Sequence, residues 1–154
     1  NLASFTVELS SLAVNLRYVC TAETCPQMKA TEEWMYLCAA RKQPQASNSS
    51  IDYIIHTLDG TCALLNSNKR RSSSSSSRRE RADDCFQSIT RRLYRVLSHC
   101  FFHHKEIFED FEKNNHLCLR FVAFAKAHDL IPPKLLIIPQ SGFLSCVHTQ
   151  TQQS

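Results

Sequence analysis

Residues 98–104, with the sequence SHCFFHH, place three histidines and one cysteine within seven residues of an apparently amphipathic helix. Imidazole and thiolate groups are the usual ligands of zinc, and a structural zinc takes four of them in a tetrahedral arrangement. A second pair of such groups, Cys20 and Cys25, lies in the segment CTAETC, where an apolar pattern ends. The two pairs together indicate a zinc site that joins distant parts of the chain.

Spacing alone does not decide which two histidines form the second pair of ligands. Residues four apart lie on one face of a helix, which favours His99 with His103, whereas His99 and His104 are offset by about 140°. The same pattern is also consistent with no metal at all. In that alternative Cys38 and Cys100 are ordinary core residues and the histidines are partly exposed.

A basic cluster lies one turn before the histidines, in the sequence RRLYR. Helical periodicity directs Arg91, Arg92 and Arg95 away from the apolar stripe of the same helix. Forked guanidinium donors suit phosphate oxygens, so the cluster predicts an anion site. An ordinary solvated basic face fits the same three residues.

The metal-binding and basic side chains must be positioned by helices, and four amphipathic stretches of the sequence predict such helices. We expect Ser50 to cap the second helix, and Asp83 or Asp84 to cap the third. The segment WMYLCAA is predicted to be a buried strand or short extended segment, and little other sheet is expected. The result is a mainly α protein, a helical bundle. The four predicted helices cover residues 2–19, 51–65, 85–112 and 115–130.

Composition predicts one folded domain. The chain has 154 residues, of which 43% are hydrophobic, and no apolar run is long enough to cross a bilayer. Eight cysteines beside only two glycines in a helix-rich chain indicate reduced thiols rather than a disulfide framework. The first residue is Asn and an apolar pattern begins at once, so we expect the true N-terminus and any upstream targeting signal to be missing.

Two segments are predicted to lie outside the folded core. The Ser/Arg tract at about 69–83 buries no apolar area and is expected to be a disordered insert in a domain of residues 1–139. Residues 140–154 are expected to form a disordered tail, with Cys146 and His148 unligated. The net charge of +4 is concentrated around the insert, which suggests an anionic partner.

Catalysis is not expected from these residues. His99 and Cys100 are adjacent, but Cys100 faces inward, and the chain shows no glycine-rich phosphate loop, paired carboxylates or nucleophile elbow. An RNA-binding zinc protein that uses the Arg/Ser-rich region is the alternative function. Against it, the basic cluster lacks interleaved exposed aromatic residues.

The sequence resembles the Mob family of kinase-associated adaptors, most closely its phocein branch, from about residue 7 to residue 139. That resemblance implies a left-handed four-helix core with a short hairpin and one structural zinc ion, Zn²⁺. It places the ligands on Cys20, Cys25, His99 and His104, and so replaces His103. The resemblance rests on the blocks ELSSLAVNL, CTAETCPQMKATEEWMYLCAARK, IDYIIHTLDGTCALLNSNK and RRLYRVLSHCFFHHKEIFEDFE.

The resemblance also implies a function. It suggests a non-catalytic adaptor in a striatin-interacting phosphatase and kinase (STRIPAK-like) complex, with a striatin-type scaffold, phosphatase 2A subunits and germinal-centre kinases as partners. Arg91, Arg92 and Arg95 match a family pocket for phosphorylated kinase segments. No nucleic acid is expected, and the implied location is cytoplasmic, with at most peripheral association with Golgi or endosomal membranes. One departure is the Ser/Arg tract after LLNSNK, where family members carry an aromatic and proline segment.

Overall fold

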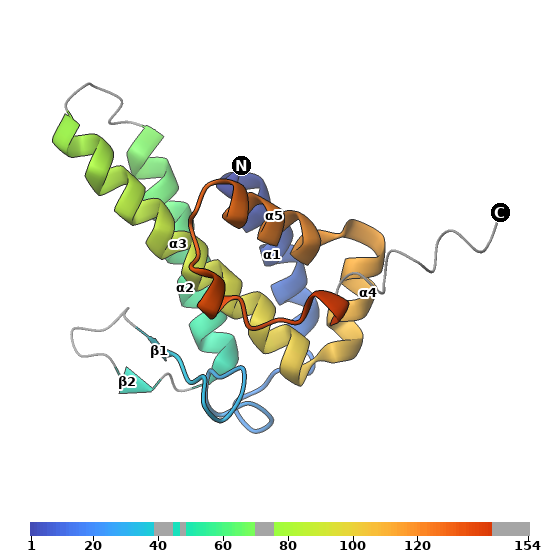
Figure 1. Ribbon diagram of the computed structural model, residues 1–154. Helices are drawn as coiled ribbons and strands as arrows, with labels where there is room; N and C mark the ends of the chain where they lie inside the picture. Colours follow the sequence, from blue (N-terminus) through green and yellow to red (C-terminus); the bar gives the residue numbers. More distant parts are fainter. Residues whose placement is uncertain (39–44, 47–48, 70–75, 143–154) are drawn as a thin grey trace.

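The computed structural model describes residues 1–38, 45–46, 49–69 and 76–142, and the chain folds into a helical domain with one small hairpin (Figure 1). None of the helices in these ranges is long and apolar enough to cross a membrane. The elements are α1 (Leu2–Leu16), β1 (Leu37–Cys38), β2 (Gln45–Ala46), α2 (Ser50–Lys69), α3 (Ser76–His103), α4 (Lys105–Asn115), α5 (Leu117–Ala127) and the 3-10 helix η1 (Pro133–Leu135).

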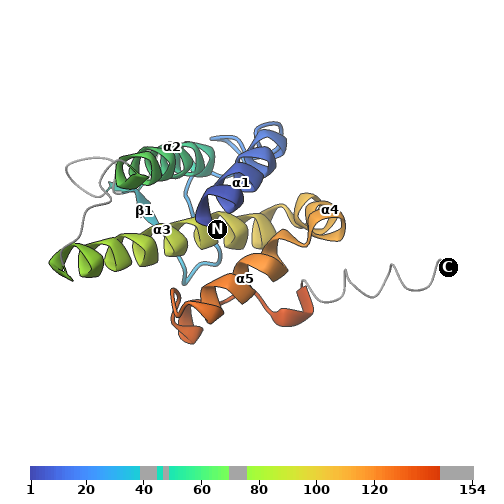
Figure 2. The same cartoon turned by 90° about the horizontal axis from the view of Figure 1, so that it is seen from above.

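The helices α1 to α5 share one hydrophobic core, which confirms the predicted helical bundle. Helices α1 and α2 lie on one side of α3 and α5 lies on the other (Figure 2). Aromatic rings join α5 to its neighbours: the Phe121 ring centroid lies 5.2 Å from that of Phe5 on α1 and 6.4 Å from that of Tyr94 on α3. Edge-on and offset ring contacts of this kind add to the apolar burial that holds the helices together.

The first predicted helix is confirmed, although it is shorter than expected. Leu9, Leu12 and Leu16 are almost completely buried, as the three- and four-residue spacing requires. The helix ends at Leu16, so Val19 no longer shares that face and its side chain is exposed. The prediction that the helix continues to residue 19 is therefore wrong.

The single long helix predicted over 85–112 is wrong at both ends. It begins earlier, at Ser76, so Asp83 and Asp84 lie inside α3 and do not cap it. It also stops at His103, and α4 begins at Lys105. Between the two helices His104 adopts φ −134° and ψ 54°, which is not a helical conformation.

The Ser/Arg tract departs from the prediction in its second half. Residues 76–83 belong to α3, whereas 70–75 lie outside the described residues. Propagating an existing helix adds one hydrogen bond per residue fixed, and Arg and Glu are good helix formers, so α3 can extend at its N-terminal end into the tract. The predicted tail lies outside the described residues beyond Gly142, so the predictions for Cys146 and His148 stay untested.

The predicted short extended or hairpin segment is confirmed. Strands β1 and β2 pair antiparallel, with Leu37 opposite Ala46 and Cys38 opposite Gln45. Met35, which precedes the hairpin, is 47% exposed. Tyr36, the residue before β1, is partly buried and packs against the core, so the segment that leads into the hairpin contacts the bundle.

A buried carboxylate joins α4 to α5. His116 has a left-handed φ of 50° between the two helices, and Glu112 is 1% exposed. The carboxylate of Glu112 accepts hydrogen bonds from the backbone N–H groups of Cys118, at 2.7 Å, and Leu119, at 2.9 Å. Burial raises the pKa of Glu112, while these two bonds oppose that shift. Glu112 thus caps donors at the start of α5 that no helical carbonyl reaches.

Replacing Glu112 with Ala is expected to lower the free energy of unfolding by about 1–3 kcal/mol, because two backbone donors lose their acceptor. Urea unfolding monitored by circular dichroism measures the change. Glu109→Ala on the same helix is the matched control, since Glu109 forms only an exposed pair with Lys105 at 3.9 Å. Equal losses in the two variants would show that Glu112 is not a cap.

Candidate metal centre

Two buried cysteines lie in the turn that follows α1. The backbone N–H of Cys20 donates to the carbonyl of Leu16 at 2.7 Å, and that of Cys25 donates to Thr21 at 2.8 Å. Both cysteines are buried, at 0% and 6% exposure. We call residues 17–36 the ligand loop; it presents both thiols to the end of α3.

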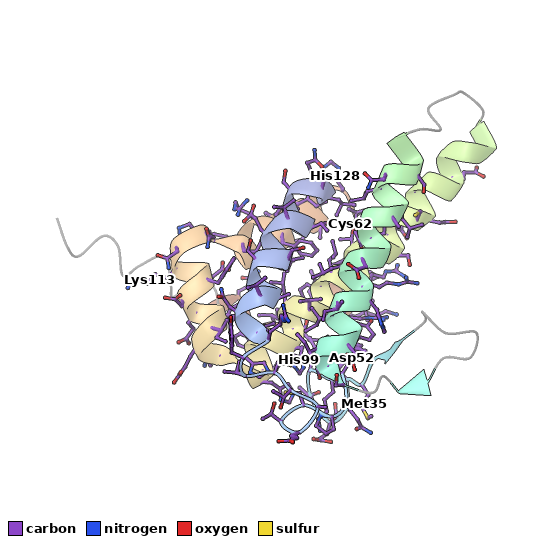
Figure 3. The ribbon with its side chains drawn as sticks, turned by 180° about the vertical axis from the view of Figure 1, so that it is seen from behind. Met35, Asp52, Cys62, His99, Lys113 and His128 are labelled. Atoms are coloured by element: carbon purple, nitrogen blue, oxygen red, sulfur yellow. The ribbon has the colours of Figure 1, made fainter. Side chains whose placement is uncertain are left out.

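Two histidines at the end of α3 meet these thiols. His99 is fully buried, and its Nδ1–H donates to the backbone carbonyl of Lys29 in the ligand loop at 2.7 Å. A carbonyl only accepts, so this bond leaves Nε2 unprotonated in the neutral ring, 3.5 Å from Sγ of Cys20. Nε2 of His104 lies 3.4 Å from Sγ of Cys25. Figure 3 shows His99 at the end of the bundle where the ligand loop carries Met35.

Ligand atoms of Cys20, Cys25, His99 and His104 all lie within 4.8 Å of one another. A tetrahedral zinc with Zn–S near 2.3 Å and Zn–N near 2.0 Å separates its ligand atoms by about 3.3–3.8 Å. The two Cys–His distances of 3.5 Å and 3.4 Å fall in that range. The four residues are therefore placed to hold a metal ion.

Burial tunes the protonation of this cluster. It lowers the pKa of His99 to about 4 and also lowers that of His104, so both rings stay neutral and keep a lone pair for a metal. Burial and the neighbouring Cys25 raise the pKa of the Cys20 thiol well above its usual range. Two thiolates in such a place need a cation beside them, which a bound divalent metal supplies.

The arginine cluster is less open than the sequence predicts. Arg91, Arg92 and Arg95 are all only partly exposed on α3. Nη1 of Arg95 donates to Oη of Tyr53 at 2.8 Å, and its guanidinium lies 5.0 Å from the ring centroid of Tyr36. The expectation that all three point away from the protein therefore fails for Arg95, because two tyrosines from other segments lie against it.

The charge of the cluster is not neutralised within the described part of the chain. None of the ion pairs found there involves an arginine of the cluster. Nε of Arg91 is buried and has no hydrogen-bond partner among the described residues. Three guanidinium groups on one side of a helix thus retain unused hydrogen-bond donors.

Residues 1–139 match the Mob1/phocein family. The chain belongs to the Mob1/phocein family. Two relatives support the assignment, each 45% identical over 139 residues: MOB-like protein phocein of Caenorhabditis elegans and MOB kinase activator-like 4 of Drosophila melanogaster. The match covers 90% of this chain but 61% of each relative, so the chain spans about three fifths of their length. The resemblance to the Mob family seen in the sequence is confirmed.

Helical spacing selected a histidine that the structure leaves outside the cluster. In this Mob1/phocein chain His103 is exposed, its ring stacks on that of His99 at 4.7 Å, and it is not a member of the Cys/His cluster. His104 reaches Cys25 because the helix is interrupted at this residue, so the 140° offset of a continuous helix does not apply. The backbone break is the physical reason why the spacing argument failed.

Replacing His104 with Ala is expected to remove the metal, because one of four ligands is lost, whereas His103→Ala should retain it. The measurement is metal content per chain by inductively coupled plasma mass spectrometry after purification without added metal. The two variants delete the same ring at neighbouring positions and serve as each other's control. Retention by His104→Ala with loss by His103→Ala would reverse the assignment.

Sequence reasoning missed the groups that fix the ligand loop. Ser49 caps α2, since its Oγ accepts the N–H of Asp52 at 3.2 Å. Ser50, predicted as the cap, instead donates its N–H to the carbonyl of Cys25 at 3.0 Å and its Oγ–H to that of Gln27 at 2.8 Å. Residue type does not distinguish the two adjacent serines, and only the position of the loop decides which of them caps the helix.

Proposed function

We propose that this Mob1/phocein chain is a non-catalytic adaptor whose metal centre holds one structural zinc. The observation that carries the proposal is the convergence on one point of four protein ligands, of which Cys20, Cys25 and His99 are buried and His104 is partly buried. Four protein ligands leave no open coordination position for water or substrate, which is the arrangement of structural rather than catalytic zinc. Two cysteines and two histidines are also a donor set that suits zinc.

The proposed partners are a striatin-type scaffold, phosphatase 2A subunits and germinal-centre kinases, in a STRIPAK-like complex. Support comes from the family and from relatives named as a phocein and as a kinase activator-like protein. A cytoplasmic location, with at most peripheral membrane association, is proposed with these partners.

Arg91, Arg92 and Arg95 are proposed to dock phosphorylated segments of partner kinases. The absence of ion pairs at these arginines within the described ranges supports an external anion. Guanidinium donors bind phosphate through charge-assisted, forked hydrogen bonds.

The RNA-binding alternative has weaker support. Single-stranded RNA needs exposed aromatic faces beside the basic groups. Near the arginines, Tyr53 and Tyr94 are buried and Tyr36 is covered by Arg95. Steep, salt-dependent binding to random RNA would favour this alternative.

Affinity purification of the tagged protein from cells, followed by mass spectrometry, tests the adaptor role. Recovery of striatin, phosphatase 2A subunits and a germinal-centre kinase together supports it. A Cys20→Ser bait is the control, because an adaptor that depends on the zinc-bound fold should lose these partners. Recovery of RNA-binding proteins in place of the phosphatase and kinase would contradict the proposal.

A further inference from the structure

We propose that Tyr36 and Tyr53 are positioning residues that hold Arg95 ready to bind phosphate. The inference rests on the proposed use of the arginine cluster as a phosphopeptide site. It adds two residues to that site which are not themselves charged. The observation behind it is that Arg95, alone among the three arginines, has a side-chain hydrogen bond and a ring contact within the described residues.

The two tyrosines constrain the Arg95 guanidinium in different ways. Tyr53 is 2% exposed on the first turns of α2, and its Oη fixes the position of Nη1 at 2.8 Å. The ring of Tyr36 lies 5.0 Å from the guanidinium carbon and attracts the cation through its negative face. One N–H of the guanidinium is used in this way, which leaves four of its five donors for a ligand.

Holding Arg95 in place matters because of its neighbours. Arg91 and Arg92 lie four and three residues before it on α3, so the three positive charges repel one another. Without this restraint the Arg95 side chain would extend into solvent. It would then lose its conformational freedom on ligand binding. A side chain that is already ordered avoids that entropic loss on binding.

Tyr36 is anchored through the ligand loop. Its backbone N–H donates to the carbonyl of Met28 at 2.8 Å, and the next residue, Lys29, accepts the Nδ1–H of His99. Met28 is 1% exposed, so this part of the loop is fixed by packing as well as by hydrogen bonds.

Tyr53 is anchored through the start of α2. Ser50, one turn earlier, donates hydrogen bonds to the carbonyls of Cys25 and Gln27 in the same loop. Both tyrosines thus belong to segments tied to the Cys/His cluster. Arg95 itself lies one helical turn before His99 on α3.

A purely structural role is the competing explanation. In that case the Arg95–Tyr53 bond only fastens α3 to α2, and its loss changes stability without changing the preference for phosphate. The decisive variants are Tyr53→Phe, which removes one hydroxyl group, and Tyr36→Leu, which removes a ring. Tyr36→Phe is the conservative rescue, because it keeps the ring face under the guanidinium.

The test measures fluorescence anisotropy of a labelled phosphothreonine peptide from a germinal-centre kinase linker and of its unphosphorylated counterpart. Tyr53→Phe and Tyr36→Leu should each weaken binding of the phosphorylated peptide about three- to tenfold, while Tyr36→Phe should bind nearly as well as wild type. Binding of the unphosphorylated peptide should not change. Metal content and urea unfolding of each variant show that the fold is retained.

A double-mutant cycle separates positioning from a general effect on the fold. If Tyr53 acts through Arg95, Tyr53→Phe should have no further effect on binding in an Arg95→Ala background. Equal effects in both backgrounds, or unchanged affinity of Tyr53→Phe while Arg92→Ala binds weakly, would overturn this inference alone. Wild-type protein that does not distinguish the two peptides would overturn the proposed phosphate site together with it.

Discussion

Replacing Cys20 with Ser is expected to abolish zinc binding and to lower the free energy of unfolding by at least about 3 kcal/mol. Metal that binds only the folded chain contributes its binding free energy to folding, and that contribution disappears with the site. The loss should affect the whole domain, because the site joins the turn after α1 to the end of α3. Urea unfolding and metal analysis of the same preparations measure both effects.

Cys62→Ser is the matched control for this prediction. Cys62 is exposed on α2 and lies well away from His99 in Figure 3, so the same atomic change should alter neither zinc content nor stability. Removing zinc from the wild-type protein with a chelator should reproduce the instability of Cys20→Ser and leave that variant unaffected. A purified wild-type protein without zinc, or a Cys20→Ser variant that unfolds at the same urea concentration, would rule out the structural metal.

Replacing both Arg92 and Arg95 with Ala is expected to weaken phosphopeptide binding by at least about tenfold. Each charge-assisted hydrogen bond to phosphate contributes roughly 1.5–3 kcal/mol before desolvation is subtracted, and the variant removes two forked donors. Isothermal titration calorimetry with phosphorylated and unphosphorylated kinase-linker peptides measures the change. Zinc content should remain the same, because neither arginine is a ligand.

The contacts of Arg95 predict that this double variant is less stable than the wild-type protein. The variant loses the Arg95 hydrogen bond to Tyr53 and the Arg95 contact with Tyr36, so its free energy of unfolding is expected to fall by about 1 kcal/mol. Lys126→Ala combined with Lys134→Ala removes the same net charge from exposed positions elsewhere and should leave peptide affinity nearly unchanged. If that control weakens binding equally, the effect is one of overall charge; if the arginine variant binds normally, the cluster is only a solvated basic face.

Local sequence patterns were sufficient to predict which segments form helices and which residue types could bind a metal. The apolar spacing of Leu9, Leu12 and Leu16 placed one buried stripe, because a helix repeats every 3.6 residues whatever lies around it. Cys20 and Cys25 are close together in the sequence, so residue type and spacing alone predicted a pair of thiol ligands. The limits of the helices were less predictable, since Ser76 starts α3 within a tract that has no apolar periodicity.

The sequence by itself determined a mainly α domain and a candidate Cys/His cluster, because these follow from periodicity and residue type, and its similarity to known proteins showed its Mob1/phocein membership. Helical spacing favoured His103 and the family resemblance favoured His104; the tertiary structure supplied the physical reason for His104, since the break at this residue is a backbone conformation that helical spacing does not encode. It likewise decided the surroundings of Arg95. Tyr36 and Tyr53 are distant from Arg95 in the chain, and they reach it only because the ligand loop and α2 fold against α3. Contacts between distant segments depend on the packing of the whole chain, and no local pattern of residues records them.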